Sequence, residues 1–384
     1  MGVNAERLLR GVREYAAHEL MTEHEAAEPP TRSQLAFHER GLANWWLPEE
    51  YGGLGVGLRD SVDAVSELAY ADAGSAFTLF VSILGSTLVS LYGSDELKDR
   101  TLRKVGASGG FSATLGSELA AGSDLTSMTT TAARGTGGLV IDGEKSFATN
   151  AGFAEFLVVI AVSADNPLEH LAIVVPRGTP GVRIVRRWQT LGMPAAGTYQ
   201  VTFEGCRVPE ANALRGPGLV LLEVGLNTTR TLIAACGVGI ARRIRDLSLA
   251  YARDKRVYGE SLLANAVFAA KLGQMEMDIE VMRNQCLAAG AEFDALAADP
   301  DGAAELLSRG ALRSAVTAKV CCGRLGWRIA TIGSEMFGGL GYTDRSPIGR
   351  LLRDMRFVSI LEGGDDVLRE LVYRRFVIPA RRRL

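Results

Sequence analysis

Three patterns of residues follow one another along the chain, and their order limits the folds that it can adopt. From Ala5 to about Val105, apolar residues recur at three- and four-residue steps, which predicts helices. Between about Phe111 and Pro209, β-branched runs such as "EFLVVIAVS" and "TYQVTFEGCRVP" alternate with turn signals, which predicts antiparallel strands. After "RGPGLVL" the helical period returns. Few architectures have this order, so we expect an α+β chain that is mainly α.

The boundaries between these patterns predict three domains. They are an N-terminal helical domain at 1–110, a middle β domain at 111–215 and a C-terminal helical bundle at 216–384. In the bundle we expect long helices at about 218–255, 262–295 and 302–334, followed by a short helix after Gly364. One glycine-rich loop, "LPEEYGGLGVGL", interrupts the first domain, and Asp142-Gly143 is a strong turn signal within the second.

Charge and composition exclude several classes of function. The chain has 384 residues, of which 47% are hydrophobic, so a large core is available. Lys and Arg number 42 against 44 Asp and Glu, a net charge of −2, which gives no long-range attraction to nucleic acid or to an anionic membrane. The closing "RRRL" is interpreted as a solvated tail. Because no apolar run reaches the roughly 18 residues of a membrane span, we expect a cytoplasmic protein.

The cysteines and histidines give no sign of a disulfide framework or a metal site. The five cysteines are scattered through apolar segments and are interpreted as reduced core residues. The four histidines show no ligand spacing with cysteine or with one another, and three of them lie near the N-terminus. We therefore expect no metal centre.

Two segments of the β domain are candidates for a polar binding site. In "LGSELAAGSDLTSMTTTA", Ser117, Glu118 and Ser123 can line a polar site, although a Gly-Ser-Asp sequence by itself is more often a tight turn. In "GEKSFATNAG", Phe147 and Thr149 are two residues apart and would face the same side of a strand. A planar heteroaromatic ligand requires an aromatic wall and a hydroxyl donor of this kind. The alternative is a core Phe beside a strand Thr.

A single carboxylate near the C-terminus, Glu362 in "ILEGGDDVLREL", is the candidate reacting group. It stands between Leu361 and a glycine pair. The alternative is a solvated turn residue, with Asp365 or Asp366 capping the helix that follows.

Seven motifs together resemble the acyl-CoA dehydrogenase family of flavoproteins. They are "LPEEYGGLGVG", "SELAAGSD", "GEKSFATN", "YARDKRVYG", "FGGLGYT", "LLRDMR" and "LEGGDD", in the family's order and at its approximate spacings. The resemblance runs from about residue 40 to 375. It implies a helical domain, a β-barrel-like antiparallel domain and a four-helix C-terminal bundle around one FAD per subunit, in a homo-oligomer that is a dimer or a tetramer.

The resemblance implies roles for the candidate residues of the β domain. Ser117 stands where a hydroxyl binds the flavin pyrimidine edge, and Ser123 where a serine contacts both the FAD phosphates and the thioester arm. Phe147 replaces the family's usual Trp over the flavin, which keeps the stacking surface and loses one N–H donor. Thr149 stands where a hydroxyl binds near the flavin N5.

In the C-terminal half, the resemblance implies further contacts with FAD. Lys255, with Arg256 beside it, takes the place of an arginine that reaches the pyrophosphate in a neighbouring subunit, and a Lys lacks the bidentate fork of Arg. The Gly338-Gly339 pair allows close backbone approach to the dinucleotide. Two positions where the family has glutamine depart from its pattern. They are Ala266 and Glu335.

The resemblance identifies Glu362 as the catalytic base. Most of the family has Tyr-Glu-Gly-Thr here, where this chain has Leu361-Glu362-Gly363-Gly364. Some relatives carry the base on an earlier helix instead, one residue before an arginine; that position is Thr229, before Arg230. We assign Leu361, Gly363, Arg230 and Ser123 to the substrate side and Gly364 to the cofactor side.

The implied reaction is α,β-dehydrogenation of an acyl thioester. Glu362 would take the α-proton while the β-hydride passes to flavin N5, on a CoA or an acyl-carrier-protein substrate, with electron transfer flavoprotein as the acceptor. An unperturbed Glu pKa of about 4.3 is too low for this proton, so the site must raise it. The alternatives are a flavin-dependent monooxygenase of the same fold, whose members generally lack the glutamate, and a flavin-binding subunit without turnover.

Overall fold

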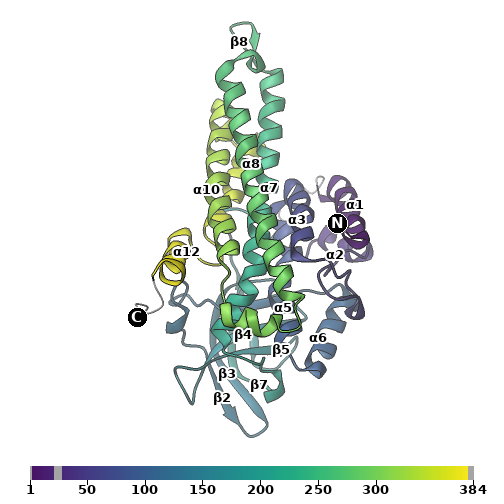
Figure 1. Cartoon of the computed structure of the whole chain (residues 1–384), viewed down its shortest axis with the longest axis vertical. Helices are drawn as coiled ribbons and strands as arrows, with labels where there is room; N and C mark the ends of the chain where they lie inside the picture. Colours follow the sequence, from purple (N-terminus) through teal and green to yellow (C-terminus); the bar gives the residue numbers. More distant parts are fainter. Residues whose placement is uncertain (1, 21–27, 379–384) are drawn as a thin grey trace.

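The computed structural model describes residues 2–20 and 28–378, and the closing "RRRL" and His24 lie outside them. Helices come first, a sheet follows, and longer helices end the chain (Figure 1). The expected α+β architecture, mainly α, is confirmed. The N-terminal helices are α1 (Val3–His18), α2 (Arg32–Glu39), α3 (Leu58–Ala71), α4 (Ala73–Phe80), α5 (Ile83–Tyr92) and α6 (Asp95–Ser108).

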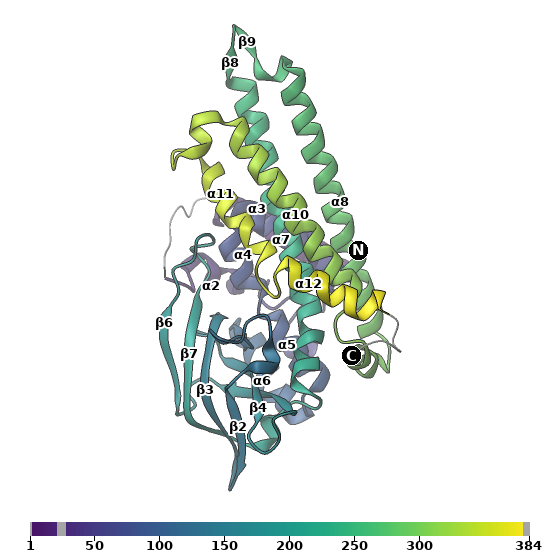
Figure 2. The same ribbon diagram turned by 90° about the vertical axis from the view of Figure 1, so that its left-hand side faces the viewer.

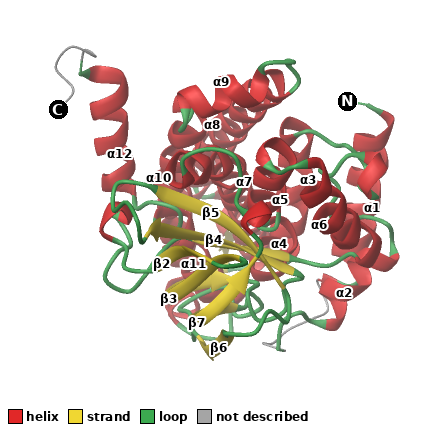
Figure 3. Cartoon of the chain, turned by 90° about the horizontal axis from the view of Figure 1, so that it is seen from below, coloured by secondary structure: helices red, strands yellow, loops and turns green. Residues whose placement is uncertain are grey.

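The middle of the chain forms one seven-stranded sheet. Its strands are β1 (Ser112–Leu115), β2 (Thr131–Gly135), β3 (Gly138–Thr149), β4 (Phe156–Ser163), β5 (His170–Pro176), β6 (Val182–Arg187) and β7 (Thr198–Val208). The strand order is β1-β4-β2-β3-β7-β6, with β5 also paired to β4. The expected antiparallel pairing holds for most of the sheet, but β4 pairs with β1 and with β2 in parallel. Figure 3 shows the strands side by side, with helices behind them.

The turn predicted at Asp142-Gly143 is wrong. These residues lie inside β3, where the pairing with β7 shifts register between Ile141 and Gly143. Gly143 has φ of 139°, and a Cβ there would lie 2.6 Å from the Cα of Thr130. The signal came from a β-bulge, which uses the same conformational freedom of glycine as a turn.

The C-terminal half is a bundle of long helices. Its helices are α7 (Gly218–Asp254), α8 (Ala266–Ala297), α9 (Gly302–Arg309), α10 (Arg313–Met336), α11 (Pro347–Met355) and α12 (Asp365–Val372). The long helix predicted at 302–334 is two helices, because Gly310 adopts φ of 62° and ends α9. A two-stranded hairpin, β8 (Arg256–Val257) and β9 (Glu260–Ser261), joins α7 to α8 at the end of the molecule opposite the sheet (Figures 1 and 2).

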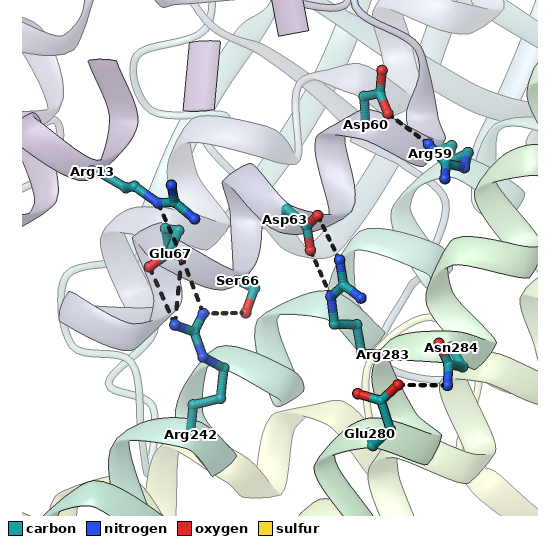
Figure 4. A network of polar contacts seen from close by, with 10 residues as sticks. All are labelled: Arg13, Arg59, Asp60, Asp63, Ser66, Glu67, Arg242, Glu280, Arg283 and Asn284. Atoms are coloured by element: carbon teal, nitrogen blue, oxygen red, sulfur yellow. Dashed lines mark hydrogen bonds and ion pairs between the residues drawn. The ribbon is translucent and has the colours of Figure 1, made fainter. Parts of the chain in front are cut away.

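Helix α3 attaches the N-terminal helices to the bundle (Figure 4). Its Glu67 accepts hydrogen bonds from Arg13 of α1 and Arg242 of α7. Its Asp63 accepts two hydrogen bonds of 2.9 Å from Arg283 of α8. Partly exposed ion pairs are each worth only about 0–1 kcal/mol, so they fix orientation more than they stabilise. The apolar core beneath is continuous between the N-terminal helices and the bundle.

Two helical stretches, 73–92 and 218–254, are long and apolar enough to span a membrane by length and composition. The prediction that no stretch reaches that length is therefore wrong by this measure. In each stretch, 78% of the apolar 18-residue window is buried inside the fold. Buried core helices of soluble proteins meet the same criterion of length and composition. All five cysteines are free, and four are buried, which confirms reduced cysteines in the core for those four; Cys321 is half-buried.

Candidate active site

Glu362 lies in the short connection between a 3₁₀ turn at Arg356–Ser359 and helix α12. The backbone there is left-handed, with φ of 54° at Glu362 and 102° at Gly363. A side chain in this conformation is unusual and requires support from its surroundings. The support comes from α7, because Thr229 Oγ1 donates a 2.6 Å hydrogen bond to Glu362 Oε2 and Arg230 Nε donates a 3.0 Å bond to the Glu362 carbonyl oxygen.

The carboxylate of Glu362 is surrounded by protein, although the residue as a whole keeps some exposure. Burial raises its pKa from 4.5 to about 7, against the opposing effects of the Thr229 hydrogen bond and the charges of Arg230 and Lys319. A carboxylate whose pKa lies near neutral pH is suited to act as a general base there. The interpretation as a solvated turn residue does not fit this environment.

Lys319, which the sequence interpretation missed, supports the same turn from α10. Its side chain is fully buried; Nζ donates a hydrogen bond to the carbonyl oxygen of Gly363 and lies 3.7 Å from Asp365 Oδ1. Burial lowers its pKa to about 8, although Asp365 raises it. The available signal was a lone lysine in the apolar run "SAVTAKVCC".

The predicted aspartate cap of the last helix is wrong. Gly364 occupies the position before α12, and no side chain caps it. Asp365 and Asp366 lie in the first turn of α12, where carboxylates interact favourably with the helix N-terminus. Asp365 faces Lys319, so part of the conspicuous "GGDD" sequence supports the turn that carries Glu362.

Phe147 stands out on the sheet. It is 56% exposed and has φ of 59°, and its ring stacks on Trp188 at 5.2 Å between centroids. The guanidinium of Arg186 lies 3.9 Å from the Trp188 ring centroid. Trp188 Nε1 is buried without a hydrogen-bond partner in the described part of the chain. The interpretation of Phe147 as a core residue is thus ruled out, and an aromatic platform with an unsatisfied donor beside it remains.

The Ser117 segment lies against the strand that carries Phe147. The Ser146 N–H donates a 2.9 Å hydrogen bond to the Ser117 carbonyl oxygen. Next to it, the buried Lys145 donates bonds of 2.9 Å to the Gly116 carbonyl and 3.0 Å to Glu118 Oε1. This buried ion pair therefore fixes the Ser117 segment relative to Phe147.

The remaining two candidates of the β domain are less enclosed. Ser123 is exposed in the loop before a 3₁₀ turn at Leu125–Ser127. Thr149, half-buried at the end of β3, has its hydroxyl 3.3 Å from that of Thr198.

Comparisons with known proteins agree over almost the whole chain. Models of the N-terminal, middle and C-terminal domains of acyl-CoA dehydrogenases match residues 4–109, 113–206 and 216–377. A probable acyl-CoA dehydrogenase of Mycobacterium tuberculosis is 30% identical over 354 residues, which are 91% of this chain and 88% of the relative. The chain belongs to the acyl-CoA dehydrogenase family. Enzymes of this family are FAD-dependent oxidoreductases.

Solved structures of the acyl-CoA dehydrogenase fold superpose closely on the chain. The butyryl-CoA dehydrogenase of Megasphaera elsdenii has a TM-score of 0.86 at 24% identity, covering 96% of this chain and 97% of that one. The prolyl acyl carrier protein oxidase AnaB has a TM-score of 0.85 at 21% identity, covering 97% and 99%. At these identities the two structures show the shared fold, and not a shared substrate.

The family's FAD can be tested against the residues present. An exposed, stacked Phe147 beside an unsatisfied Trp188 Nε1 fits a planar ring system that brings hydrogen-bond acceptors. The flanking hydroxyls of Ser117 and Thr149 add donors. The residues present therefore fit a flavin.

Four other residues, for which the family resemblance predicts contact with FAD, lie outside the β domain. Lys255 and Arg256 are exposed where α7 meets the β8–β9 hairpin, and Gly338 and Gly339 are exposed just after α10. This placement leaves them accessible to a second subunit. Of the two positions that depart from the family pattern, Ala266 is exposed at the start of α8, and Glu335 forms a 3.6 Å ion pair with Lys271, which offsets part of its charge.

Proposed function

We propose that this chain is an FAD-dependent dehydrogenase that introduces an α,β double bond into an acyl thioester, with Glu362 as the base. The observation that carries the proposal is the environment of Glu362, a carboxylate surrounded by protein that receives the Thr229 hydrogen bond and has its pKa raised to about 7 by burial. Such a group can accept a proton from carbon once substrate excludes the remaining water. FAD, when bound, would supply the acceptor for the hydride that leaves the β-carbon.

The residues around Glu362 have separate proposed roles in the reaction. Glu362 Oε1, which receives no hydrogen bond from the described residues, is the oxygen free to accept the α-proton. The backbone N–H of Glu362 also has no acceptor among the described residues and is available to the thioester oxygen, where negative charge develops. Thr229 and Arg230 hold the turn. Ser123, Leu361 and Gly363 complete the proposed substrate side.

The cofactor side is proposed to use Ser117, Ser123, Phe147, Thr149 and Gly364. Lys255, Arg256, Gly338 and Gly339 would contact the FAD of a neighbouring subunit in a homo-oligomer. This arrangement is supported by the exposure of all four residues. Electron transfer flavoprotein is the proposed acceptor of the reducing equivalents.

An anaerobic screen tests reaction and substrate together. Purified flavin-containing protein is mixed with a series of acyl-CoA and acyl-carrier-protein thioesters, and the flavin absorbance is followed. Bleaching without NAD(P)H, with the 2,3-enoyl thioester as product, is the expected result. A protein that purifies without FAD, or whose flavin is bleached only by NAD(P)H, would contradict the proposal. The thioester that bleaches fastest identifies the acyl group and whether CoA or a carrier protein bears it.

A further inference from the structure

The turn that carries Glu362 is held by cations at two consecutive carbonyl groups. Arg230 Nε of α7 donates a 3.0 Å hydrogen bond to the carbonyl oxygen of Glu362, and Lys319 Nζ of α10 donates to that of Gly363. Both turn residues have positive φ, a conformation that is strained at a non-glycine residue such as Glu362 and persists only when its surroundings hold it. Two cationic donors from separate helices provide that constraint.

A buried lysine is expensive, so its presence requires an explanation. Lys319 has no exposed surface, and removing an ion from water is unfavourable even after the protein relaxes. Asp365, 3.7 Å away, offsets part of that cost but is itself partly buried. An apolar residue in α10 would fill the same space at lower cost. The lysine therefore serves something other than the packing of α10.

We propose that Lys319 is a positioning residue for the reaction of Glu362. Its ammonium group fixes the turn at 362–364, so that the Glu362 carboxylate and backbone N–H face the substrate together, and its charge lowers the free energy of the ionised base. This inference rests on the proposed function. The charged groups that face the Glu362 turn are Arg230 from α7, Lys319 from α10 and Asp365 from α12.

The first test measures hydrogen exchange in the holoenzyme of Lys319→Gln, with Lys98→Gln of α6 as the control. Lys98 forms a surface ion pair with Asp95, so its loss should change nothing measured here. Hydrogen exchange of the peptide that contains residues 360–364 is expected to become faster in Lys319→Gln only. Exchange identical to wild type would overturn the proposal. This measurement does not depend on activity, so it remains decisive if no thioester reduces the wild-type flavin and the proposed function fails.

The second measurement is the pH dependence of anaerobic flavin reduction by the best thioester. In Lys319→Gln we expect a rate at pH 7 lowered by about 10- to 100-fold and an acid limb moved up by about one pH unit, because Glu362 loses a neighbouring positive charge. A rate and an acid limb equal to those of wild type would overturn the proposal. If Lys319→Gln does not fold, the same pH dependence is measured on Asp365→Asn. Because Asp365 raises the Lys319 pKa, its loss removes part of the Lys319 charge near neutral pH, and the acid limb is expected to move to higher pH. An unmoved limb would overturn the proposal.

Discussion

The hydroxyl group of Thr229 donates a 2.6 Å hydrogen bond to Oε2 of Glu362, although the two residues are 133 positions apart in the sequence. The family resemblance implies that Thr229 stands at the position where some acyl-CoA dehydrogenases carry the base. The two candidate positions for the base thus meet in space, and the Thr229 hydroxyl hydrogen-bonds the Glu362 carboxylate. A hydroxyl donor favours the ionised form, so Thr229 works against the burial that raises the Glu362 pKa.

Thr229→Val removes this donor while keeping the shape of the side chain. The pKa of Glu362 is then expected to rise further, and the acid limb of flavin reduction against pH should move up by about one unit. The control is Thr231→Val, two residues along α7, which is equally buried and loses only a bond to the carbonyl of Asn227 within its own helix. Coincident profiles for Thr229→Val and wild type would show that the hydrogen bond does not tune the base.

The buried carboxylate should also reduce the stability of the fold at neutral pH. Because the Glu362 pKa is raised from 4.5 unfolded to about 7 folded, the folded state binds the proton more tightly. Its favourable contribution is complete below pH 4.5 and is lost as pH rises through 7. Glu362→Gln, which does not ionise, is expected to gain roughly 1–3 kcal/mol in free energy of unfolding relative to wild type between pH 5 and pH 8.

Urea denaturation of both proteins at pH 5 and pH 8 measures this difference. A surface substitution of the same kind, Glu96→Gln near the start of α6, serves as the control and should show no such change. A constant difference between Glu362→Gln and wild type across this range would contradict the raised pKa.

The order of the three architectural parts followed from the periodicity of the sequence, since helical and strand periods depend on local chemistry. Local signals failed where tertiary contacts decide the conformation. Asp142-Gly143 has the composition of a turn but forms a bulge, because Thr130 packs against Gly143. Gly310 ends a helix within a continuous helical pattern.

The candidate site was predictable only where a motif carried it. Glu362, Phe147 and Ser117 were identified from motifs, whereas Lys319 and Trp188 were not. Both missed residues act through partners that are distant in sequence, Lys319 through Gly363 and Trp188 through Phe147. The periodicity of a single segment contains no information on such contacts.

Lys145 and Glu118 form a buried ion pair whose loss should affect both stability and cofactor binding. Burial raises the pKa of Glu118, but hydrogen bonds from Thr129 and Thr130 outweigh it and hold the pKa at about 2. Lys145→Met would leave this carboxylate buried without its cation, which typically costs about 3–5 kcal/mol. We expect this loss by urea denaturation, together with reduced FAD content, because the Ser117 segment is no longer fixed.

A lysine on the surface provides the comparison. Lys104→Met removes an exposed partner of Glu155 and should lower stability by less than about 1 kcal/mol. If Lys145→Met retained wild-type stability and FAD content, the buried pair would have no role in fixing the cofactor side.

Phe147→Ala should weaken FAD binding with little effect on the fold. The ring is 56% exposed, so little core is lost, whereas a stacking surface worth roughly 0.5–1.5 kcal/mol beyond its area disappears. We expect the FAD dissociation constant to rise about tenfold. Phe147→Trp, which keeps the aromatic face, should bind as wild type does, and Leu168→Ala, at a 91% exposed position, should be neutral. Unchanged affinity in Phe147→Ala would place the flavin elsewhere.

The most direct test of the proposed mechanism is single-turnover flavin reduction by Glu362→Gln, without oxygen, using the thioester that bleaches the wild type. Gln keeps the size of the side chain and can still accept the Thr229 hydrogen bond, but it cannot take a proton from carbon at neutral pH. We predict that the variant retains FAD and binds the thioester, with a reduction rate lowered by about 10²- to 10⁴-fold or more. Reduction within tenfold of the wild-type rate would show that Glu362 is not the base.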